Sequence, residues 1–245
     1  MTIAHTIRLL ARKVGVELNW YKPAQSQHAR LFRLLAHHGI ETVLDVGANN
    51  GGFGSSLREG GFAGDILSFE PLAEAHRELT ARTAGDTRWH VAPRMALGAD
   101  DGDIEINVAG NSTSSSILPM RELHAQAAPG SRYTGVERVP LRRVDRLSHP
   151  VLARNSVMLL KIDAQGYEMP VLQGAASLLP RIHGIQLELS LAPLYESQTL
   201  DMEMMHWLTA HGFALWNVIP GFTDPTSGRM LQMDGIFFRT PANAE

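Results

Sequence analysis

One stretch constrains the fold more than any other, residues 43–54, which read VLDVGANNGGFG. Val43, Leu44 and Val46 form a short apolar run, glycines follow at once, and a helix-like segment comes next. This pattern predicts a buried strand, a tight glycine turn and a helix. Because glycine has no Cβ, such a turn lets the backbone approach a ligand, and the N–H groups at the helix N-terminus attract an anionic group. The stretch therefore predicts a site for a nucleotide-like cofactor.

The spacing within the turn distinguishes between cofactors. A dinucleotide fingerprint would read G-x-G-x-x-G, but Asn49 takes the place of its second glycine and Asp45 lies two residues before Gly47. Both departures count against NAD. The order D-x-G-x-N-x-G, which ends at Gly51, is similar to the acid–glycine turn of S-adenosylmethionine-dependent methyltransferases. A glycine-rich turn without a ligand is the alternative.

A second acid follows the next expected strand. Residues 65–71 read DILSFEP, so a strand ends at Glu70, and Pro71 can open the following helix. In a βαβ unit this position lies at the tip of the neighbouring strand, where a carboxylate can accept hydrogen bonds from ribose hydroxyls. The alternative for Glu70 is an acid stabilised by the helix dipole. Residues 89–97 predict the third strand.

Residues 157–168, VMLLKIDAQGYE, form the second informative stretch. They predict a buried strand, a sharp turn at Gly166 and a helix over residues 168–179. Lys161 and Asp163 project from the same face by period-two alternation, and Asp163 lies at the carboxyl end, where open α/β sheets bind ligands. A helix-capping role is the alternative for Asp163. Residues 184–191 repeat the pattern, with Glu188 near the strand end.

Composition limits the class of protein. The 245 residues carry a formal net charge of −3, so we expect no general electrostatic attraction to nucleic acid. The chain has no cysteine and no apolar run long enough to span a bilayer, which favours a cytoplasmic protein in a reducing compartment. We expect a basic N-terminal helical cap over residues 1–40 and one domain over residues 41–240. The roles of the cap and of the serine-rich residues 112–116 stay open, as does a homo-oligomer.

Taken together, VLDVGANNGGF, SFEP, MALG, the serine loop and KIDAQGYE followed by LQGA resemble the FkbM-type methyltransferases, a branch of the S-adenosylmethionine-dependent class I enzymes. The resemblance covers residues 42–239. It implies an α/β, Rossmann-like fold with a seven-stranded, mostly parallel sheet, an antiparallel last strand and helices on both faces. It also implies methyl transfer, usually to a hydroxyl oxygen. Gln165 departs from the family, which commonly has an acid there.

The resemblance also implies residue roles. The expected contacts of the methionine end of S-adenosylmethionine are Gly47, Asn49 and Gly51, and its amino group is expected near Asp45. Glu70 is expected to hold the ribose, and the adenine is expected beside Met95 and Ala96. Asp163 is expected closest to the methyl group and the acceptor. An alcohol gains from losing its proton as it attacks, so we expect Asp163 as the general base, Glu188 as the second candidate and Lys161 as a modulator of either.

The sequence therefore predicts an S-adenosylmethionine-dependent O-methyltransferase acting on a hydroxyl of a sugar, glycan or secondary metabolite. Mg²⁺ held by the two acids would also lower the pKa of the hydroxyl, but it is the less favoured mechanism, and no metal ligands are assigned. Two other classes stay open. The chain could bind S-adenosylmethionine without catalysis, or it could be an NAD-dependent nucleotide-sugar enzyme.

Overall fold

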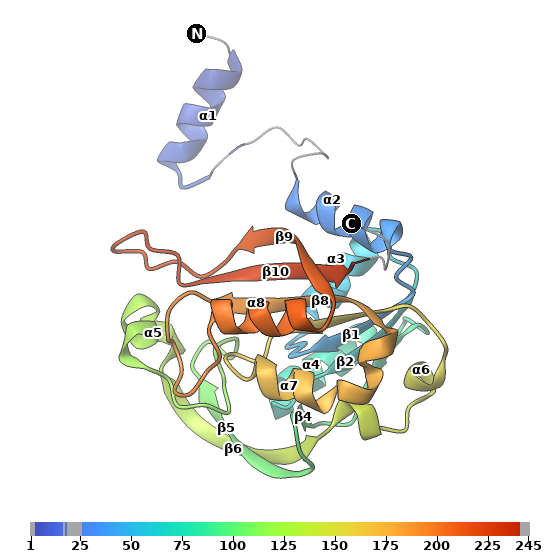
Figure 1. Cartoon of the computed structure of the whole chain (residues 1–245). Coiled ribbons are helices and arrows are strands. Elements are labelled where there is room, and N and C mark those ends of the chain that lie inside the picture. The colour runs from blue at the N-terminus through green and yellow to red at the C-terminus, as the bar shows by residue number, and fades with distance from the viewer. Residues whose placement is uncertain (1–2, 17, 19–25, 241–245) are drawn as a thin grey trace.

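A seven-stranded β-sheet lies at the centre of the computed structural model (Figure 1), which describes residues 3–16, 18 and 26–240. Its strand order is β3-β2-β1-β7-β8-β10-β9. Neighbouring strands from β3 to β8 are parallel, whereas β10 runs antiparallel to both β8 and β9, so the predicted α/β fold is confirmed. The strands are β1 (Thr42–Val46), β2 (Asp65–Phe69), β3 (Trp89–Val91), β7 (Met158–Ile162), β8 (Ile182–Ser190), β9 (Phe213–Pro220) and β10 (Gln232–Arg239).

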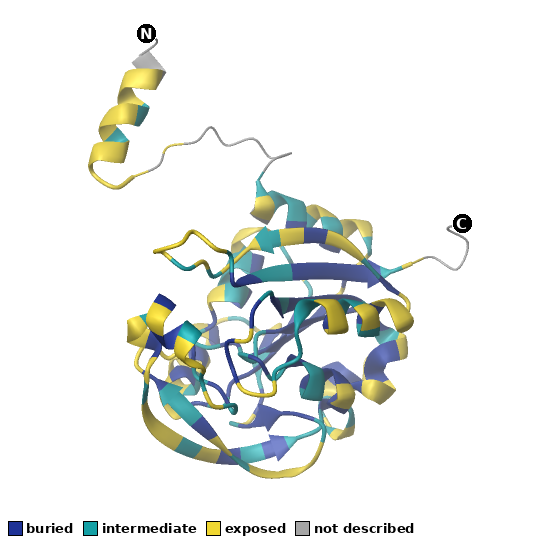
Figure 2. Ribbon diagram, turned by 60° about the vertical axis from the view of Figure 1, so that its left-hand side comes forward, coloured by how far each residue is buried: buried dark blue, intermediate teal, exposed yellow. Residues whose placement is uncertain are grey.

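Helices cover both faces of this sheet. One face packs against α2 (Gln27–His37), α3 (Gly52–Glu59) and α4 (Ala73–Thr83). The other face packs against α6 (Pro150–Ala153), α7 (Glu168–Gly174) and α8 (Asp201–Ala210). Figure 2 shows the result, a sheet that is buried along most of its length and helices whose outer sides are exposed.

Strands β1, β2 and β7 are buried at every residue, which explains their nearly continuous apolar sequences. Successive side chains point to opposite faces. Val43 and Leu159 pack in the core on the α2, α3 and α4 side, and Leu44 and Leu160 pack in the core on the other side. Charged residues on β1 and β7 therefore share a face with Val43 and Leu159.

A smaller sheet has the order β4-β6-β5 and consists of β4 (Ala96–Leu97), β5 (Gly102–Ala109) and β6 (Tyr133–Arg142). The prediction of one strand over residues 89–97 is wrong in its extent. The strand β3 ends at Val91, and β4 pairs with β6 instead. Pro93 lies between the two strands, and proline has no N–H to donate to a ladder. This division places Met95 and Ala96 beside the second sheet.

The helix that follows β7 is shorter than predicted. The helix predicted over residues 168–179 ends at Gly174, and a 3₁₀ helix, η3 (Ala176–Arg181), follows it with Pro180 inside. A Cβ on Gly174 would lie 2.0 Å from the carbonyl oxygen of Gly98, so the glycines of the MALG and LQGA segments let two backbones touch. The other short elements are α5 (Glu122–Ala127), η1 (Pro129–Ser131) and η2 (Val144–Arg146).

The predicted N-terminal cap lies partly outside the described residues, so its boundary stays a prediction. Within the described part, α2 packs on the sheet through Leu31 and Leu35. Helix α1 (Ile3–Lys13) differs, because Ile7, Leu10 and the following Val14 are exposed. Figure 2 shows most of this helix in the colour of exposed residues. None of the helices seen in the described residues has the length and apolar character needed to cross a membrane.

Leu159 provides a test of the core, since it is fully buried and its Cδ1 lies directly above Gly184 of β8. We expect Leu159→Ala to lower the free energy of unfolding by about 2–5 kcal/mol, because the sheet cannot close over the cavity that it leaves. Val136→Ala, at an exposed position of β6, is the control and should change the free energy of unfolding by about 0.5 kcal/mol or less. Urea unfolding measures both, and equal losses would contradict this account of the core.

Candidate functional site

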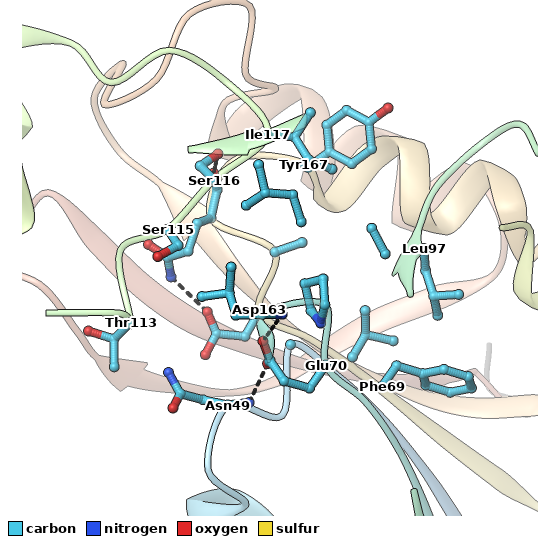
Figure 3. A pocket seen from close by; sticks show the side chains of 18 of the residues that line it. Asn49, Phe69, Glu70, Leu97, Thr113, Ser115, Ser116, Ile117, Asp163 and Tyr167 are labelled. Atoms are coloured by element: carbon cyan, nitrogen blue, oxygen red, sulfur yellow. Dashed lines mark hydrogen bonds between the residues drawn. The ribbon is translucent and has the colours of Figure 1, made fainter. Parts of the chain in front are cut away.

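A cavity of about 730 Å³, counted with its solvent-open mouth, lies at the carboxyl ends of β1, β2 and β7 (Figure 3). The turns that follow the three strands supply Gly47, Asn49, Glu70 and Asp163 to its lining. The serine loop closes another side through Ser112, Thr113, Ser115 and Ser116. A cavity of this size at the carboxyl edge of a parallel sheet is the expected place for a small-molecule ligand.

The turn after β1 requires glycine for a structural reason. Gly47 has φ of +72°, and a Cβ there would lie 1.9 Å from the carbonyl oxygen of Asp163. The ends of β1 and β7 therefore approach each other more closely than any side chain at Gly47 would permit. Gly51, with φ of +86°, is the N-cap of α3, and a Cβ there would lie 2.9 Å from Cδ1 of Leu79 on α4, so this position also requires glycine.

Glu70 joins the turns that follow β1 and β2. Its Oε2 accepts a hydrogen bond from the backbone N–H of Asn49 at 2.7 Å, and its Oε1 accepts one from the backbone N–H of Leu72 at 2.9 Å. Burial raises the pKa of Glu70 to about 7, although these two hydrogen bonds oppose the shift. Each carboxylate oxygen keeps a lone pair for a further donor, such as a ribose hydroxyl.

Lys161 of β7 lies between two carboxylates. Its Nζ is 3.2 Å from Oδ1 of Asp45 and 3.5 Å from Oδ2 of Asp163, and it donates a hydrogen bond to the carbonyl oxygen of Gly47 at 3.3 Å. Burial alone would lower the pKa of Lys161, but the two carboxylates outweigh it and the pKa is raised. The lysine therefore stays charged and ties β1 and its turn to the acid at the end of β7.

Gln165 connects Asp163 to Glu188. Its Nε2 donates to Oδ1 of Asp163 at 2.7 Å and to Oε2 of Glu188 at 2.9 Å, while its Oε1 accepts a hydrogen bond from the hydroxyl of Tyr195 at 2.9 Å. An amide can donate to two carboxylates at once, which an ionised acid at this position could not do. Burial, with Asp163 nearby, raises the pKa of Glu188 well above its ordinary value.

The predicted site residues divide into two groups. Those that line the cavity are Gly47, Asn49, Glu70, Met95, Ala96 and Asp163. Those that do not line it are Asp45, Gly51, Lys161 and Glu188, of which Asp45 is fully buried and accepts a hydrogen bond from Ser68 at 3.3 Å. The binding and catalytic roles of both groups stay predictions.

The structure gives contacts for the serine loop, whose role the sequence left open, and for Glu168, which sequence reasoning missed. The serine loop reaches the glycine turn, since Nδ2 of Asn49 donates to Oγ of Ser112 at 3.4 Å, and Oγ of Ser116 donates to the carbonyl of Gln165 at 2.6 Å. Glu168 is buried at the start of α7, and its Oε1 accepts hydrogen bonds from the N–H groups of Ala164 and Gly166, both at 3.1 Å. An acid immediately after the turn was the available signal for Glu168.

The cavity suits S-adenosylmethionine by its shape and its chemistry. Glycine at position 47 lets the turn lie against the backbone of Asp163 at the edge of the cavity, and Glu70 offers acceptor oxygens. Apolar side chains of Met95, Leu97 and Ile106 line the region where a flat, weakly polar adenine would lie. No group of three or more histidine or acidic side chains suited to a metal ion occurs within the described part of the chain.

A sequence comparison matches the Methyltransferase FkbM domain over residues 45–215, which is more than half of the chain. The chain therefore belongs to the FkbM family of methyltransferases, which places it among the S-adenosylmethionine-dependent methyltransferases. The predicted family is confirmed, and the site described above falls within the matched residues. No curated protein sequence matches the chain.

Solved structures show a similar arrangement at low identity. TehB from Haemophilus influenzae is 8% identical with a TM-score of 0.48, covering 88% of this chain and 63% of TehB. A TehB-like SAM-dependent methyltransferase from Corynebacterium glutamicum is 14% identical with a TM-score of 0.43, covering 97% and 96%. Sp1610 of Streptococcus pneumoniae, a candidate tRNA (m1A22) methyltransferase in complex with S-adenosyl-L-methionine, is 10% identical with a TM-score of 0.47, covering 88% and 75%.

The buried carboxyl group of Glu168 makes the stability of the protein depend on pH. Burial raises its pKa from 4.5 to about 7, so its ionised form destabilises the fold increasingly between these pH values and by a constant amount above them. Glu168→Gln keeps an acceptor oxygen for the two N–H groups and removes the charge. We expect this variant to be more stable than the wild type at pH 8, by up to about 3 kcal/mol, with no difference below pH 4.5.

Urea unfolding of both proteins at pH 4.5 and pH 8 measures this difference. Glu105→Gln, on an exposed position of β5, serves as the control and should show none. The difference in free energy of unfolding between Glu168→Gln and wild type should be larger at pH 8 than at pH 4.5. An equal difference at the two pH values would contradict the buried-charge account.

Proposed function

We propose that this methyltransferase transfers the methyl group of S-adenosylmethionine to a hydroxyl oxygen, with Asp163 as the general base. The observation that carries the proposal is the position of Asp163, which lines the cavity at the carboxyl end of β7 with 39% of its side chain exposed. Of the two carboxylates that contact Lys161, Asp163 is thus the one that a ligand in the cavity can reach. The sugar, glycan or secondary-metabolite acceptor is part of the proposal.

The cofactor would lie along the edge of the sheet. Gly47 and Asn49 would hold its methionine end, Glu70 its ribose, and Met95 and Ala96 its adenine. Bound S-adenosylmethionine supplies an electrophilic methyl group, so the task left to the chain is to align an acceptor oxygen and accept its proton. Asp45 would support the binding of the amino group indirectly, because it pairs with Lys161, which in turn bonds the carbonyl oxygen of Gly47 in the turn.

Three neighbours prepare Asp163 for this role. Lys161 Nζ lies 3.5 Å from Oδ2 of Asp163, Gln165 donates a hydrogen bond to Oδ1 of Asp163, and the backbone N–H of Asp163 donates to the carbonyl of Val46 at 3.0 Å. Glu188 is less suited, because its raised pKa favours the protonated form and it is not among the residues that line the cavity. A positioned base of this kind contributes roughly 10²- to 10⁴-fold to the rate.

The other classes fit the site less well. A dinucleotide enzyme would require close backbone approach at position 49, where Asn49 has φ of +47° and its side chain points toward the serine loop. A protein that only binds the cofactor would have no use for a partly exposed carboxylate such as Asp163 in the lining of the cavity. Mg²⁺ assistance stays the less favoured mechanism.

Substitution of Asp163 tests the proposal. In a screen of hydroxylated acceptors with radiolabelled S-adenosylmethionine, we expect methyl ethers as products and a 10²- to 10⁴-fold lower kcat for Asp163→Asn, with cofactor affinity within about threefold of wild type. Asp224→Asn, in the exposed turn before β10, is the matched control. Unchanged turnover of Asp163→Asn at saturating cofactor, or methylation at nitrogen, would refute the assignment.

A further inference from the structure

Helix α1 carries an apolar face that no other described element covers. Ile7, Leu10 and the following Val14 are spaced by three and four residues, so they lie on one side of the helix, and we call them the α1 apolar face. Their exposed fractions are 50%, 59% and 77%. Figure 1 shows α1 standing apart from the two sheets, and none of its residues belongs to a core cluster of the described part of the chain.

Exposed apolar side chains are concentrated at this end of the chain. Among the described residues, eleven large apolar side chains are exposed, and six of these lie within residues 7–18. The other five lie on β6, α8 and β9. Single exposed apolar residues are normal on a protein surface, whereas a contiguous group of them marks an interaction site. The α1 apolar face therefore has the properties of a contact surface.

The charge of the same segment is opposite to that of the whole chain. Residues 1–40 contain six lysines and arginines and a single acid, Glu17, whereas the chain has a net charge of −3. The cations of α1 are Arg8, Arg12 and Lys13, and the helix contains no acid. Long basic side chains can lie along an apolar surface while their charged heads reach polar groups at its edge. A helix that combines an apolar face with cations is typical of one that lies in the headgroup region of an anionic membrane.

Other partners fit these features less well. Nucleic acid would attract the cations but would offer no matching surface to the α1 apolar face. A second copy of α1 would cover that face but would bring two basic helices together, and like charges repel. An anionic bilayer supplies both an apolar phase and phosphate groups. It would also repel the acidic remainder of the chain, which leaves α1 as the contact.

We infer that α1 binds the surface of an anionic membrane, with its apolar face inserted at the level of the headgroups and its cations beside the lipid phosphates. Eleven residues of helix extend over about 16 Å, roughly half the thickness of the hydrocarbon core, so α1 lies on the bilayer and does not span it. The contact would hold the methyltransferase domain at the membrane surface. This inference does not depend on the methyl acceptor or on the proposed base.

Flotation of the full chain with lipid vesicles tests the inference. We expect the wild type to float with phosphatidylcholine vesicles that contain about one quarter phosphatidylglycerol, and to float much less with phosphatidylcholine alone. Leu10→Ser combined with Val14→Ser removes most of the α1 apolar face. Arg8→Glu combined with Arg12→Glu reverses two of its charges. Each double variant should lower the partition coefficient into the anionic vesicles by roughly tenfold or more.

Two double variants are the matched controls and should float like the wild type. Val136→Ser with Met202→Ser changes exposed apolar positions of β6 and α8, and Arg121→Glu with Arg229→Glu reverses two exposed charges outside α1. The α1 variants should keep the thermal unfolding midpoint of the wild type, because α1 lies outside the core clusters of the described residues.

Three results would overturn the inference. The first is a wild type that does not float with the anionic vesicles, and the second is a pair of α1 variants that float as well as the wild type. The third is a concentration-dependent dimer in analytical ultracentrifugation that the α1 variants lose, without flotation of the wild type. That result would assign the α1 apolar face to a second copy of the chain.

Discussion

The ammonium group of Lys161 holds the site together. It lies within 3.5 Å of both Asp45 and Asp163 and bonds the carbonyl of Gly47, so one cation connects the strand and turn of β1 to the end of β7. Removing one partner from a buried ion pair costs more than the pair itself contributes, because the other charge stays buried without compensation. Asp45, which is fully buried, would be that charge. The glycine turn and the proposed base therefore share one electrostatic support.

Gln165 shows how a departure from a family pattern can be accommodated. Its φ of +50° directs the side chain between Asp163 and Glu188, and its amide donates to both. An ionised acid at this position would place a further negative charge beside both carboxyl groups. With glutamine, Lys161 can support Asp163 while Glu188 is held by amides of Gln165 and Gln232. The two acids thus receive different environments.

Much of this site could be predicted from the sequence, because parallel strands bring their carboxyl ends to one edge. That rule was enough to place Gly47, Glu70 and Asp163 around one cavity. Contacts between distant segments could not be predicted. The bond from Asn49 to Ser112 spans 63 residues, and the contact of Gly98 with Gly174 depends on how α7 packs. Burial, which raises the pKa of Glu168, also depends on tertiary packing that local pattern does not encode.

The central claim is that the turn at Gly47 and the acid Glu70 bind S-adenosylmethionine. Isothermal titration of the wild-type protein with S-adenosylmethionine, S-adenosylhomocysteine and NAD, repeated on Glu70→Ala and on the control Glu105→Ala, tests it most directly. We expect both adenosyl compounds to bind, NAD not to bind, and Glu70→Ala to weaken binding by roughly 10- to 100-fold, the worth of a hydrogen bond to a charged group. The account would be contradicted if only NAD bound, if none of the three compounds bound, or if Glu70→Ala bound the adenosyl compounds with full affinity.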